Sequence, residues 1–171
     1  MKILKHIESF VRKNYFFIEG KIDLDAEYFI NKINQGIQER QHNLTHVKGD
    51  MTDWRYFAHD EVFLKTIVPV IKQCIDPLDL PPYNLSDAWG IAEKFSDRTT
   101  QHDHMPCVFS GILYLNEVDQ PTCFPEIKQE IKPEKGKLVL FDSILQHYAK
   151  RNITDKTKYA VVFNAPRIKD F

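Results

Sequence analysis

The segment Gln101–Asn116, which reads QHDHMPCVFSGILYLN, constrains the fold of this chain more than any other stretch. Its second half alternates on a strict two-residue period, and one set of alternate positions holds Val108, Ser110, Ile112 and Tyr114. This is the period of a β-strand, in which successive side chains point to opposite faces of a sheet. The chain is therefore predicted to build a β-sheet around this segment.

Three histidines flank the apolar strands of this predicted sheet. His102 and His104 precede the alternating segment, and His147 follows a second apolar run at 138–141. Side chains at i and i+2 of an extended chain point the same way, so both imidazoles of the pair can reach one ion while Asp103 points away. A histidine pair with a distant third histidine is typical of a facial three-ligand site with open positions, which favours redox or hydrolytic metals over structural zinc.

Composition limits the classes of protein to which the chain can belong. A length of 171 residues with 43% hydrophobic residues suits one core, so we expect a single domain spanning residues 1–171. The 23 Lys and Arg nearly balance the 24 Asp and Glu, which gives no electrostatic reason to expect nucleic acid or an anionic membrane as an obligatory partner. Charges interrupt the N-terminal segment, so neither a signal peptide nor a membrane span is predicted, and we expect a soluble, cytoplasmic protein. Nothing in the composition indicates a homo-oligomer.

The cysteines argue against a disulfide framework. Cys74, Cys107 and Cys123 are odd in number and lack C-x-x-C spacing, so they are predicted to be reduced packing residues.

Helical periodicity is confined to the first half of the chain. After Asp25, an N-cap residue, apolar side chains recur at helical spacing and predict an amphipathic helix to about Glu39. A second helix is predicted over 61–75, with Pro69 kinking it or beginning it afresh. The apolar run at 15–18, followed by Glu-Gly, predicts a short strand ending in a turn.

The second half is predicted to be rich in strands. The candidate strands lie at 85–95, 108–115, 129–131, 137–141 and 158–164. Helices followed by antiparallel strands indicate an α+β protein. We expect a double-stranded β-helix, or jelly roll, in which residues 1–82 are mainly helical support and residues 83–171 form the β-rich catalytic core.

The last predicted strand carries a cation. One of its faces holds Lys158, Ala160, Val162 and Asn164. If this face looks inward, Lys158 needs a carboxylate, since a buried ammonium without a partner is too costly, and the strand itself offers none. A small-molecule carboxylate would serve, and Tyr114 could supply a hydroxyl to the same anion. In the competing interpretation, Lys158 is solvated and the opposite face, with Phe163, looks into the core.

Together these motifs resemble the iron(II)- and 2-oxoglutarate-dependent oxygenases. The resemblance is carried by HDH before SGILYLN, by GKLVLFDSILQH, and by Lys158 in TKYAVVFN, eleven residues after His147. Within that superfamily the chain is most similar to small prolyl-hydroxylase-like members and to a group, common in marine phages and bacteria, that carries H-x-H before an SG-x-x-YL strand. VKGDMTDW, at 47–54, is similar to the N-terminal signature of that group. The similarity spans nearly the whole chain.

The resemblance implies a set of iron ligands. His102 corresponds to the first ligand and His147 to the distal one, whereas His104 stands where most of the superfamily has Asp or Glu. Three ligand sets remain open: three histidines, two histidines with water, or a set in which Asp103 swings in. We favour three histidines. A neutral imidazole in place of a carboxylate is expected to weaken the hold on iron.

The resemblance also implies a clamp for the co-substrate. Lys158 stands where the family usually has the Arg that binds the far carboxylate of 2-oxoglutarate, and Tyr114 stands where a hydroxyl joins that clamp in prolyl hydroxylases. Arg151, four residues after His147, is the nearest rival to Lys158. Further residues expected near the pocket are Trp89, Arg167 and the lid segments 52–56 and 96–100, whereas His42, His46 and His59 are expected to be surface or satisfied histidines.

Three functions from different classes follow. The resemblance implies a dioxygenase that uses Fe(II), 2-oxoglutarate and O2, with ascorbate as a candidate auxiliary reductant. It would hydroxylate an unactivated carbon of a peptide or small molecule and release succinate and CO2. A three-histidine dioxygenase of the cupin kind, which does not use 2-oxoglutarate, also suits the motif. The third is a non-catalytic jelly-roll binding module. The 2-oxoglutarate dioxygenase requires the cation of Lys158, whereas the cupin kind does not. Stabilisation of the folded protein by iron and 2-oxoglutarate would distinguish an enzyme from the binding module.

Overall fold

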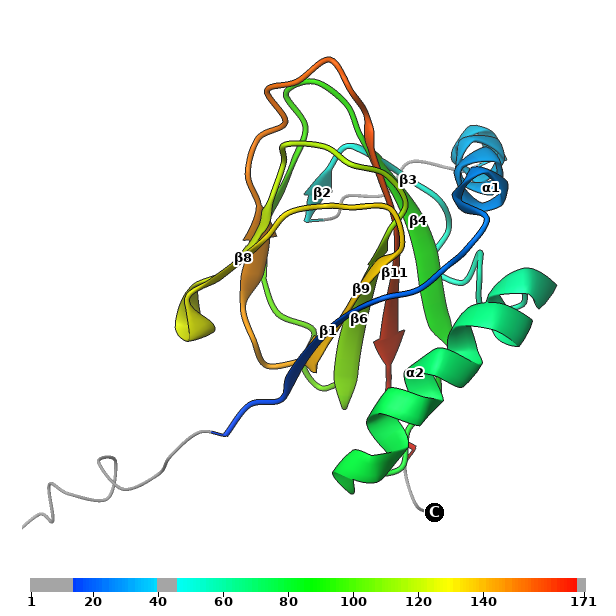
Figure 1. Ribbon diagram of the computed structural model, residues 1–171, viewed down its shortest axis with the longest axis vertical. Helices are drawn as coiled ribbons and strands as arrows, with labels where there is room; N and C mark the ends of the chain where they lie inside the picture. The colour runs from blue at the N-terminus through cyan, green and yellow to red at the C-terminus, as the bar shows by residue number, and fades with distance from the viewer. Residues whose placement is uncertain (1–13, 40–45, 169–171) are drawn as a thin grey trace, which may run out of the picture.

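Two antiparallel β-sheets face each other in this computed structural model, which describes residues 14–39 and 46–168 (Figure 1). The larger sheet has the order β1 (Phe17–Lys21), β9 (Lys137–Asp142), β6 (Phe109–Tyr114), β11 (Lys158–Ala165), β4 (Asp87–Glu93) and β3 (Asp50–Met51). The smaller has the order β2 (Val47–Lys48), β5 (Arg98–His102), β10 (His147–Ala149), β7 (Thr122–Phe124) and β8 (Gln129–Ile131). Most neighbouring strands in the two sheets come from distant parts of the chain, so residues remote in sequence meet between the sheets.

The helices lie close to their predicted positions, and the first of them begins at its predicted cap. The backbone of Tyr28 donates to the Asp25 carboxylate at the start of α1 (Ala26–Glu39), 3.2 Å away. The second predicted helix is divided into a π-helical segment, Phe63–Ile67, and α2 (Val68–Ile75). Pro69 lies in the first turn of α2, where a missing amide hydrogen does least harm, so the expectation that it begins a helix afresh is confirmed. Short 3₁₀ helices cover Asp76–Leu78 and Pro125–Ile127.

The central strands of the larger sheet, β9, β6, β11 and β4, are buried on both faces. Its outer face packs against α1, the π-helical segment and α2 in a cluster that includes Phe29, Ile33, Ile71, Leu113 and Phe163 (Figure 1). Its inner face packs against the smaller sheet in a second cluster that includes Ile91, Ile112, Val139, Phe141 and Ala160. Each interpretation of the last strand is therefore confirmed in part. Phe163 packs in the outer cluster, as the second one expected, and Lys158 is buried, as the first one expected.

The strands with apolar alternation are found where they were expected, and the polar ones were missed. β4, β6, β8, β9 and β11 correspond to the five candidate strands, and β1 overlaps the predicted short strand at 15–18 but begins two residues later than it. The smaller sheet was largely overlooked, because β5, β7 and β10 are short or polar. Residues 96–100 were expected to be a lid, which is wrong for Arg98 onward, since these residues enter β5.

Gly111 in β6 lies against the outer cluster and allows a matched stability test. A Cβ at this position would collide with the Phe163 ring and lie 2.9 Å from Leu140 Cδ2, whereas a Cβ on Gly20 in β1 would meet nothing within 4 Å. We expect Gly111→Ala to lower the free energy of unfolding by about 1–3 kcal/mol through overpacking. Gly20→Ala should change it by less than about 0.5 kcal/mol. Urea denaturation of the two variants measures the difference, and equal effects would contradict the tight packing of β6 on β11.

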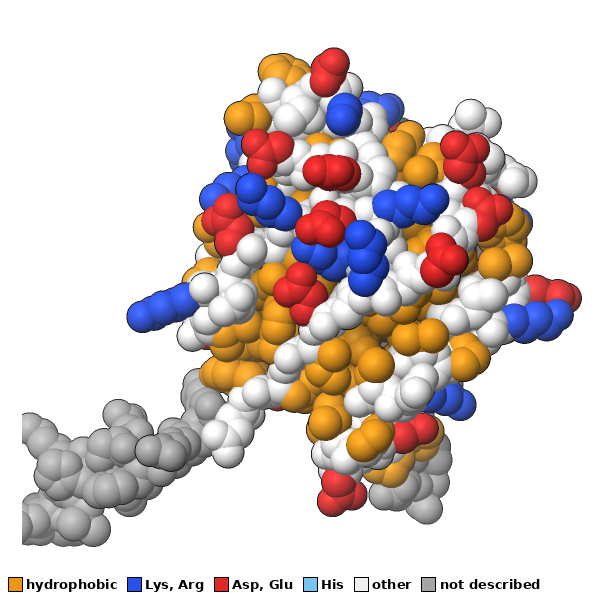
Figure 2. All heavy atoms as spheres, viewed as in Figure 1, with side chains coloured by type: hydrophobic (Ala, Val, Ile, Leu, Met, Phe, Trp, Pro, Cys, Tyr) orange, Lys and Arg blue, Asp and Glu red, His pale blue; other side chains and the backbone are white. Residues whose placement is uncertain are grey.

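The surface charges, the cysteines and the helices can each be compared with what the composition predicts. Acidic and basic side chains are intermixed on the face shown in Figure 2. Cys74, Cys107 and Cys123 are free thiols, as predicted. Among residues 14–39 and 46–168, no helix has both the length and the apolar character needed to cross a bilayer.

Candidate metal centre and pocket

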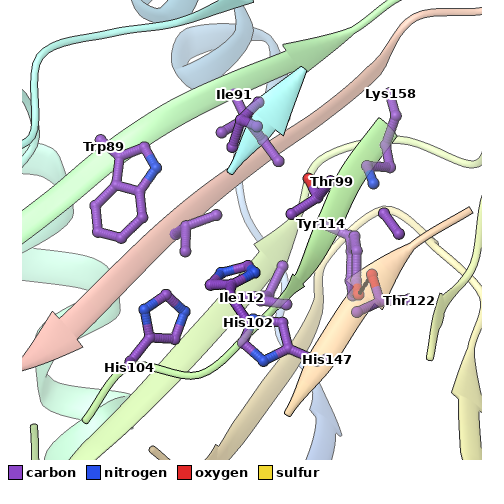
Figure 3. Close-up of a pocket in the computed structure, with 13 residues that line it drawn as sticks. Trp89, Ile91, Thr99, His102, His104, Ile112, Tyr114, Thr122, His147 and Lys158 are labelled. Atoms are coloured by element: carbon purple, nitrogen blue, oxygen red, sulfur yellow. Dashed lines mark hydrogen bonds between the residues drawn. The ribbon is translucent and has the colours of Figure 1, made fainter. Parts of the chain in front are cut away.

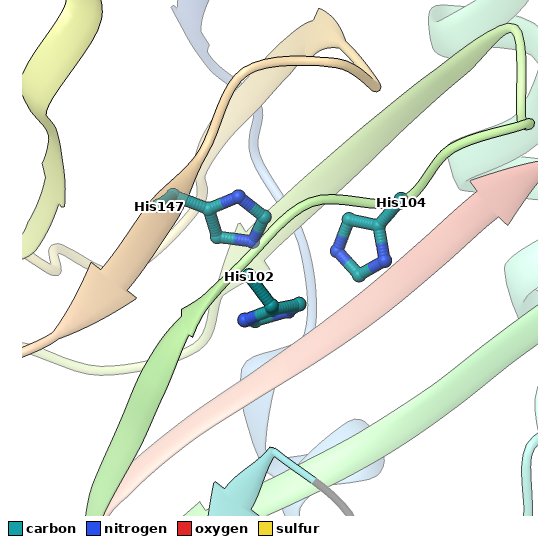
Figure 4. A group of neighbouring side chains, drawn as sticks. All are labelled: His102, His104 and His147. Atoms are coloured by element: carbon teal, nitrogen blue, oxygen red, sulfur yellow. The ribbon is translucent and has the colours of Figure 1, made fainter.

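Three imidazoles converge at one end of the space between the sheets. One ring nitrogen from each of His102, His104 and His147 lies within 4.8 Å of the other two (Figure 4). His102 ends β5 and His147 begins β10, and the two residues are direct partners in the antiparallel ladder. The predicted convergence of histidines from two distant segments is what the structure has.

The reason given for the convergence of the pair is wrong in one respect. His102 is the last residue of β5, and His104 lies in the following turn, so the two do not share one face of a strand. The backbone of His104 is fixed instead by hydrogen bonds with Ser143 and Cys107, both 2.9 Å long. Asp103 belongs to this turn, since its carboxylate accepts from the backbone of Met105 at 3.1 Å, and it is outside the group of donor nitrogens.

Hydrogen bonds set the tautomers of two of the histidines. His102 Nδ1 lies 2.8 Å from the carbonyl of Thr100, and His147 Nδ1 lies 3.1 Å from that of Leu145. A carbonyl oxygen can only accept, so both Nδ1 atoms carry the hydrogen and both Nε2 atoms keep a free lone pair. These bonds are the kind of support that orients metal-binding imidazoles.

The third histidine has a buried nitrogen without a partner. His104 Nε2 has no hydrogen-bond partner among the described residues, while its Nδ1 lies 3.3 Å from the Asn164 amide. Asn164 also accepts a hydrogen bond from Ser110 at 2.8 Å. If the Asn164 amide is turned round, its oxygen accepts from His104 Nδ1 and its nitrogen donates to Ser110, which frees His104 Nε2 as a lone-pair donor.

Burial keeps the three imidazoles neutral. Loss of solvent, and then the neighbouring His147, lowers the pKa of His104 to about 2. Burial lowers the pKa of His147 to about 3, with a further contribution from His102, and also lowers the pKa of His102. A neutral imidazole is the form that binds a metal ion. Three neutral nitrogens, one of them buried without a partner, therefore fit a divalent transition metal such as iron(II).

Aromatic and imidazole rings hold the cluster in place. The ring of His147 stacks on Phe124 at a centroid separation of 5.4 Å and meets the edge of Phe141 at 4.9 Å. His46, expected to be an ordinary surface histidine, stacks on His102 with ring centroids 4.7 Å apart and planes 4° apart. This contact was missed because β2, which follows His46, is only two residues long and shows no apolar alternation.

A small pocket, with a cavity volume of about 40 Å³, extends from the histidines between the two sheets (Figure 3). Its lining includes the three histidines and Trp89, Ile91, Thr99, Tyr114, Thr122 and Lys158. Tyr114 is fully buried, its hydroxyl donates to Thr122 at 2.7 Å, and burial raises its pKa. Trp89 was expected to border the pocket and does, and its buried Nε1 has no partner among the described residues.

Lys158 also lines the pocket, but it already has a counter-ion. Its ammonium forms an ion pair with Glu93, and the side chains are 2% and 0% exposed. The two residues are direct partners on β11 and β4, and Thr99 Oγ1 donates to Glu93 at 2.7 Å. The strand of Lys158 offers no carboxylate, as expected, but the neighbouring strand does, so Glu93 takes the place for which a small-molecule carboxylate was suggested.

Arg151 is not brought to this pocket. Its side chain is exposed, and its guanidinium lies 3.4 Å from the hydroxyl of Ser96. Arg167 is likewise absent from the pocket lining. In the segment 52–56, Trp54 meets the edge of Trp89 at a centroid separation of 4.6 Å, so this segment does reach the pocket residues. His59 is exposed as expected, and His42 lies outside the described residues.

The fold is similar to that of several proteins of known structure. No protein-family model and no curated protein sequence matches the chain. Among solved structures, the viral collagen prolyl hydroxylase of Paramecium bursaria Chlorella virus-1 in complex with 2-oxoglutarate matches with a TM-score of 0.70 and 17% identity, covering 91% of this chain and 97% of that one. A prolyl-4-hydroxylase of Pseudomonas putida matches with a TM-score of 0.63 and 14% identity, covering 90% and 93%.

A third match extends the likeness beyond prolyl hydroxylases. HygX of Streptomyces hygroscopicus, solved with nickel and 2-oxoglutarate bound, has a TM-score of 0.60 and 12% identity, covering 90% of this chain and 82% of that one. At such low identities, these matches establish that the chain shares the fold of these proteins.

Proposed function

We propose that this chain is an iron(II)- and 2-oxoglutarate-dependent dioxygenase with a double-stranded β-helix core. The observation that carries the proposal is the arrangement of one pocket, with three neutral histidines at one end and a buried ammonium among its lining residues. The shared fold supports it, because three of the similar structures are named as prolyl hydroxylases or contain 2-oxoglutarate. Hydroxylation of a peptide or small molecule is the reaction that this similarity favours.

The proposed ligands are the Nε2 atoms of His102, His104 and His147. With three protein ligands on one face, an iron(II) ion would keep open positions for a 2-oxo acid and dioxygen, and it would supply the oxidising chemistry of the site. The protein orients two of the rings through the carbonyls of Thr100 and Leu145. The turned amide of Asn164 would hold the hydrogen on His104 Nδ1, away from the metal.

The pocket residues would bind the co-substrate. Lys158 has further N–H groups besides the one facing Glu93, and these can donate to a distal carboxylate of 2-oxoglutarate. The Tyr114 hydroxyl donates a hydrogen bond to Thr122, which leaves the Thr122 hydroxyl hydrogen free to turn toward the same ligand. The raised pKa of Tyr114 keeps this phenol protonated, so it adds no competing negative charge.

Apolar side chains would exclude water and shape the substrate side of the site. Ile91, Ile112 and Val162 line the pocket together with the histidines and the polar groups. The unpartnered Nε1–H of Trp89 offers a hydrogen-bond donor to an acceptor on a bound molecule. Trp54 packs against Trp89 and is 41% exposed, so an aromatic surface continues from the pocket to solvent.

Anaerobic titration tests the proposal. Adding 2-oxoglutarate to the iron(II)-loaded protein is expected to produce the visible charge-transfer band of a chelated 2-oxo acid, and to raise the melting temperature by mass action. The metal-free protein, titrated in the same way, is the control and should show no band. An iron(II) protein that gives neither a band nor a thermal shift with 2-oxoglutarate would contradict the proposal.

A second candidate is a three-histidine dioxygenase that does not use 2-oxoglutarate. Two observations favour it: the donor group contains no carboxylate, and the charge of Lys158 is already balanced by Glu93. It predicts that iron(II) binds but that 2-oxoglutarate produces no charge-transfer band. The same titration therefore separates the two candidates.

A further inference from the structure

The polar end of the pocket holds a charge pair instead of a lone cation. Lys158 and Glu93 face each other across the β11–β4 ladder, and both side chains are buried. Lys158 and Thr99 line the pocket (Figure 3). Glu93 is not among the lining residues, and it contacts both of them. A molecule in the pocket therefore meets the ammonium first, with the carboxylate held behind it.

This arrangement changes what the ammonium can select. A ligand carboxylate that approaches Lys158 is attracted by one charge and repelled by the other, and burial leaves both interactions poorly screened. A neutral oxygen acceptor, such as an ester or amide carbonyl, still receives an N–H from Lys158 but suffers much less from Glu93. The ion pair therefore reduces the difference in affinity between a ligand with a distal carboxylate and a ligand with a neutral distal acceptor.

We infer that Glu93 is a specificity-determining residue that acts through Lys158. It weakens the preference of the pocket for a dicarboxylate and lets it accept 2-oxo acids whose distal group is a neutral hydrogen-bond acceptor. The inference rests on the proposed function, since it concerns the co-substrate of that site. Glu93 is a positioning residue for the ammonium and does not itself touch the ligand.

Two ligands differing in distal charge test the inference. The probes are 2-oxoglutarate and its 5-methyl ester, which keeps the 2-oxo acid and a distal carbonyl oxygen but has no distal charge. Their dissociation constants are measured by anaerobic titration of the iron(II) protein, following the charge-transfer band, and by thermal shift. We expect wild type to bind the two with similar affinity.

Glu93→Gln removes the charge and keeps the shape. The Gln amide can turn its oxygen to Lys158 and donate its nitrogen to Thr99, so both contacts survive. In this variant we expect the preference for 2-oxoglutarate over the ester to rise about tenfold, mainly through tighter binding of the dianion. If the role of Glu93 were purely structural, the substitution would weaken the binding of both ligands equally and leave the ratio of their dissociation constants unchanged.

Two further variants serve as controls. Glu134→Gln also removes one negative charge, from a surface pair with Lys137 outside this pocket, and should leave the ratio unchanged. Lys158→Met with Glu93→Gln removes both charges and should abolish the gain seen in Glu93→Gln alone. That result would show that Glu93 affects ligand binding through Lys158.

The outcomes separate the inference from the function on which it rests. An unchanged ratio in Glu93→Gln, with both ligands bound, overturns the inference and leaves the proposed function standing. A wild type that prefers 2-oxoglutarate by about 100-fold or more overturns it too, and this measurement does not depend on the folding of any variant. If neither ligand binds the iron(II) wild type, the proposed function fails and the inference with it.

Discussion

His147→Ala is expected to abolish tight iron(II) binding. The residue supplies the only donor nitrogen of the described cluster that comes from β10, and its ring is fixed by Phe124, Phe141 and the carbonyl of Leu145. Loss of a partner that merely orients a ligand costs about 10–100-fold in metal affinity, so loss of the ligand itself should cost at least about 100-fold. The charge-transfer band with 2-oxoglutarate should disappear at the same time.

The measurement is anaerobic iron(II) titration by calorimetry, with His59→Ala as the matched control. His59 is exposed and does not line the pocket, so its removal should leave the affinity within about twofold of wild type. Because alanine leaves a cavity beside the two phenylalanine rings, the melting temperature of the metal-free variant is recorded as a check of folding. A folded His147→Ala protein that keeps wild-type affinity for iron(II) would remove His147 from the ligand set.

Lys158→Met is expected to be the most destabilising of the substitutions considered. It leaves Glu93, which is fully buried, without its counter-ion, and Thr99 is the side chain that still donates to it. Breaking one side of a buried pair typically lowers the free energy of unfolding by about 3–5 kcal/mol, because an uncompensated charge stays inside. A loss of this size can exceed a third of the total stability of a domain.

Urea denaturation of three variants measures the origin of this loss. Lys94→Met breaks an exposed pair with Asp50 and should cost less than about 1 kcal/mol. Lys158→Met with Glu93→Gln replaces the pair by neutral groups and should recover at least about half of the loss, since no buried charge remains. If the double variant is as unstable as Lys158→Met alone, packing of the lysine stem, and not the orphaned charge, accounts for the effect.

The parts of this site that the sequence predicted are those with a local signal. His102, His104 and His147 were found because imidazoles close to apolar strands are rare and specific donors. The two-residue period of β11 grouped Lys158 with Ala160 and Val162 on one face, and the sequence left open whether this face looks inward. The alternation in β6 and β11 likewise placed Tyr114 and Val162 on the pocket side, because that period is a property of each strand alone.

The parts that were missed depend on which strands are neighbours. Glu93 and Lys158 are far apart in sequence, and only the register of β4 with β11 makes them partners. His46 is near His102 because β2 pairs with β5, and neither strand shows apolar alternation. Hydrophobic periodicity reports burial of a face, whereas pairing between strands is decided by the whole topology, so these contacts have no signature in a single sequence.

The burial of β11 on both faces links ligand binding to the integrity of the whole molecule. A slip of one residue in its pairing would carry Lys158 and Asn164 to the helical side and push Tyr159 and Phe163 into the cavity. Such a species would lose the proposed ligand-binding groups and its helix contacts in one step. A molecule that binds the ligand must therefore have the correct register of β11. The fraction of protein that gives the charge-transfer band with 2-oxoglutarate would then measure the correctly folded fraction of a preparation.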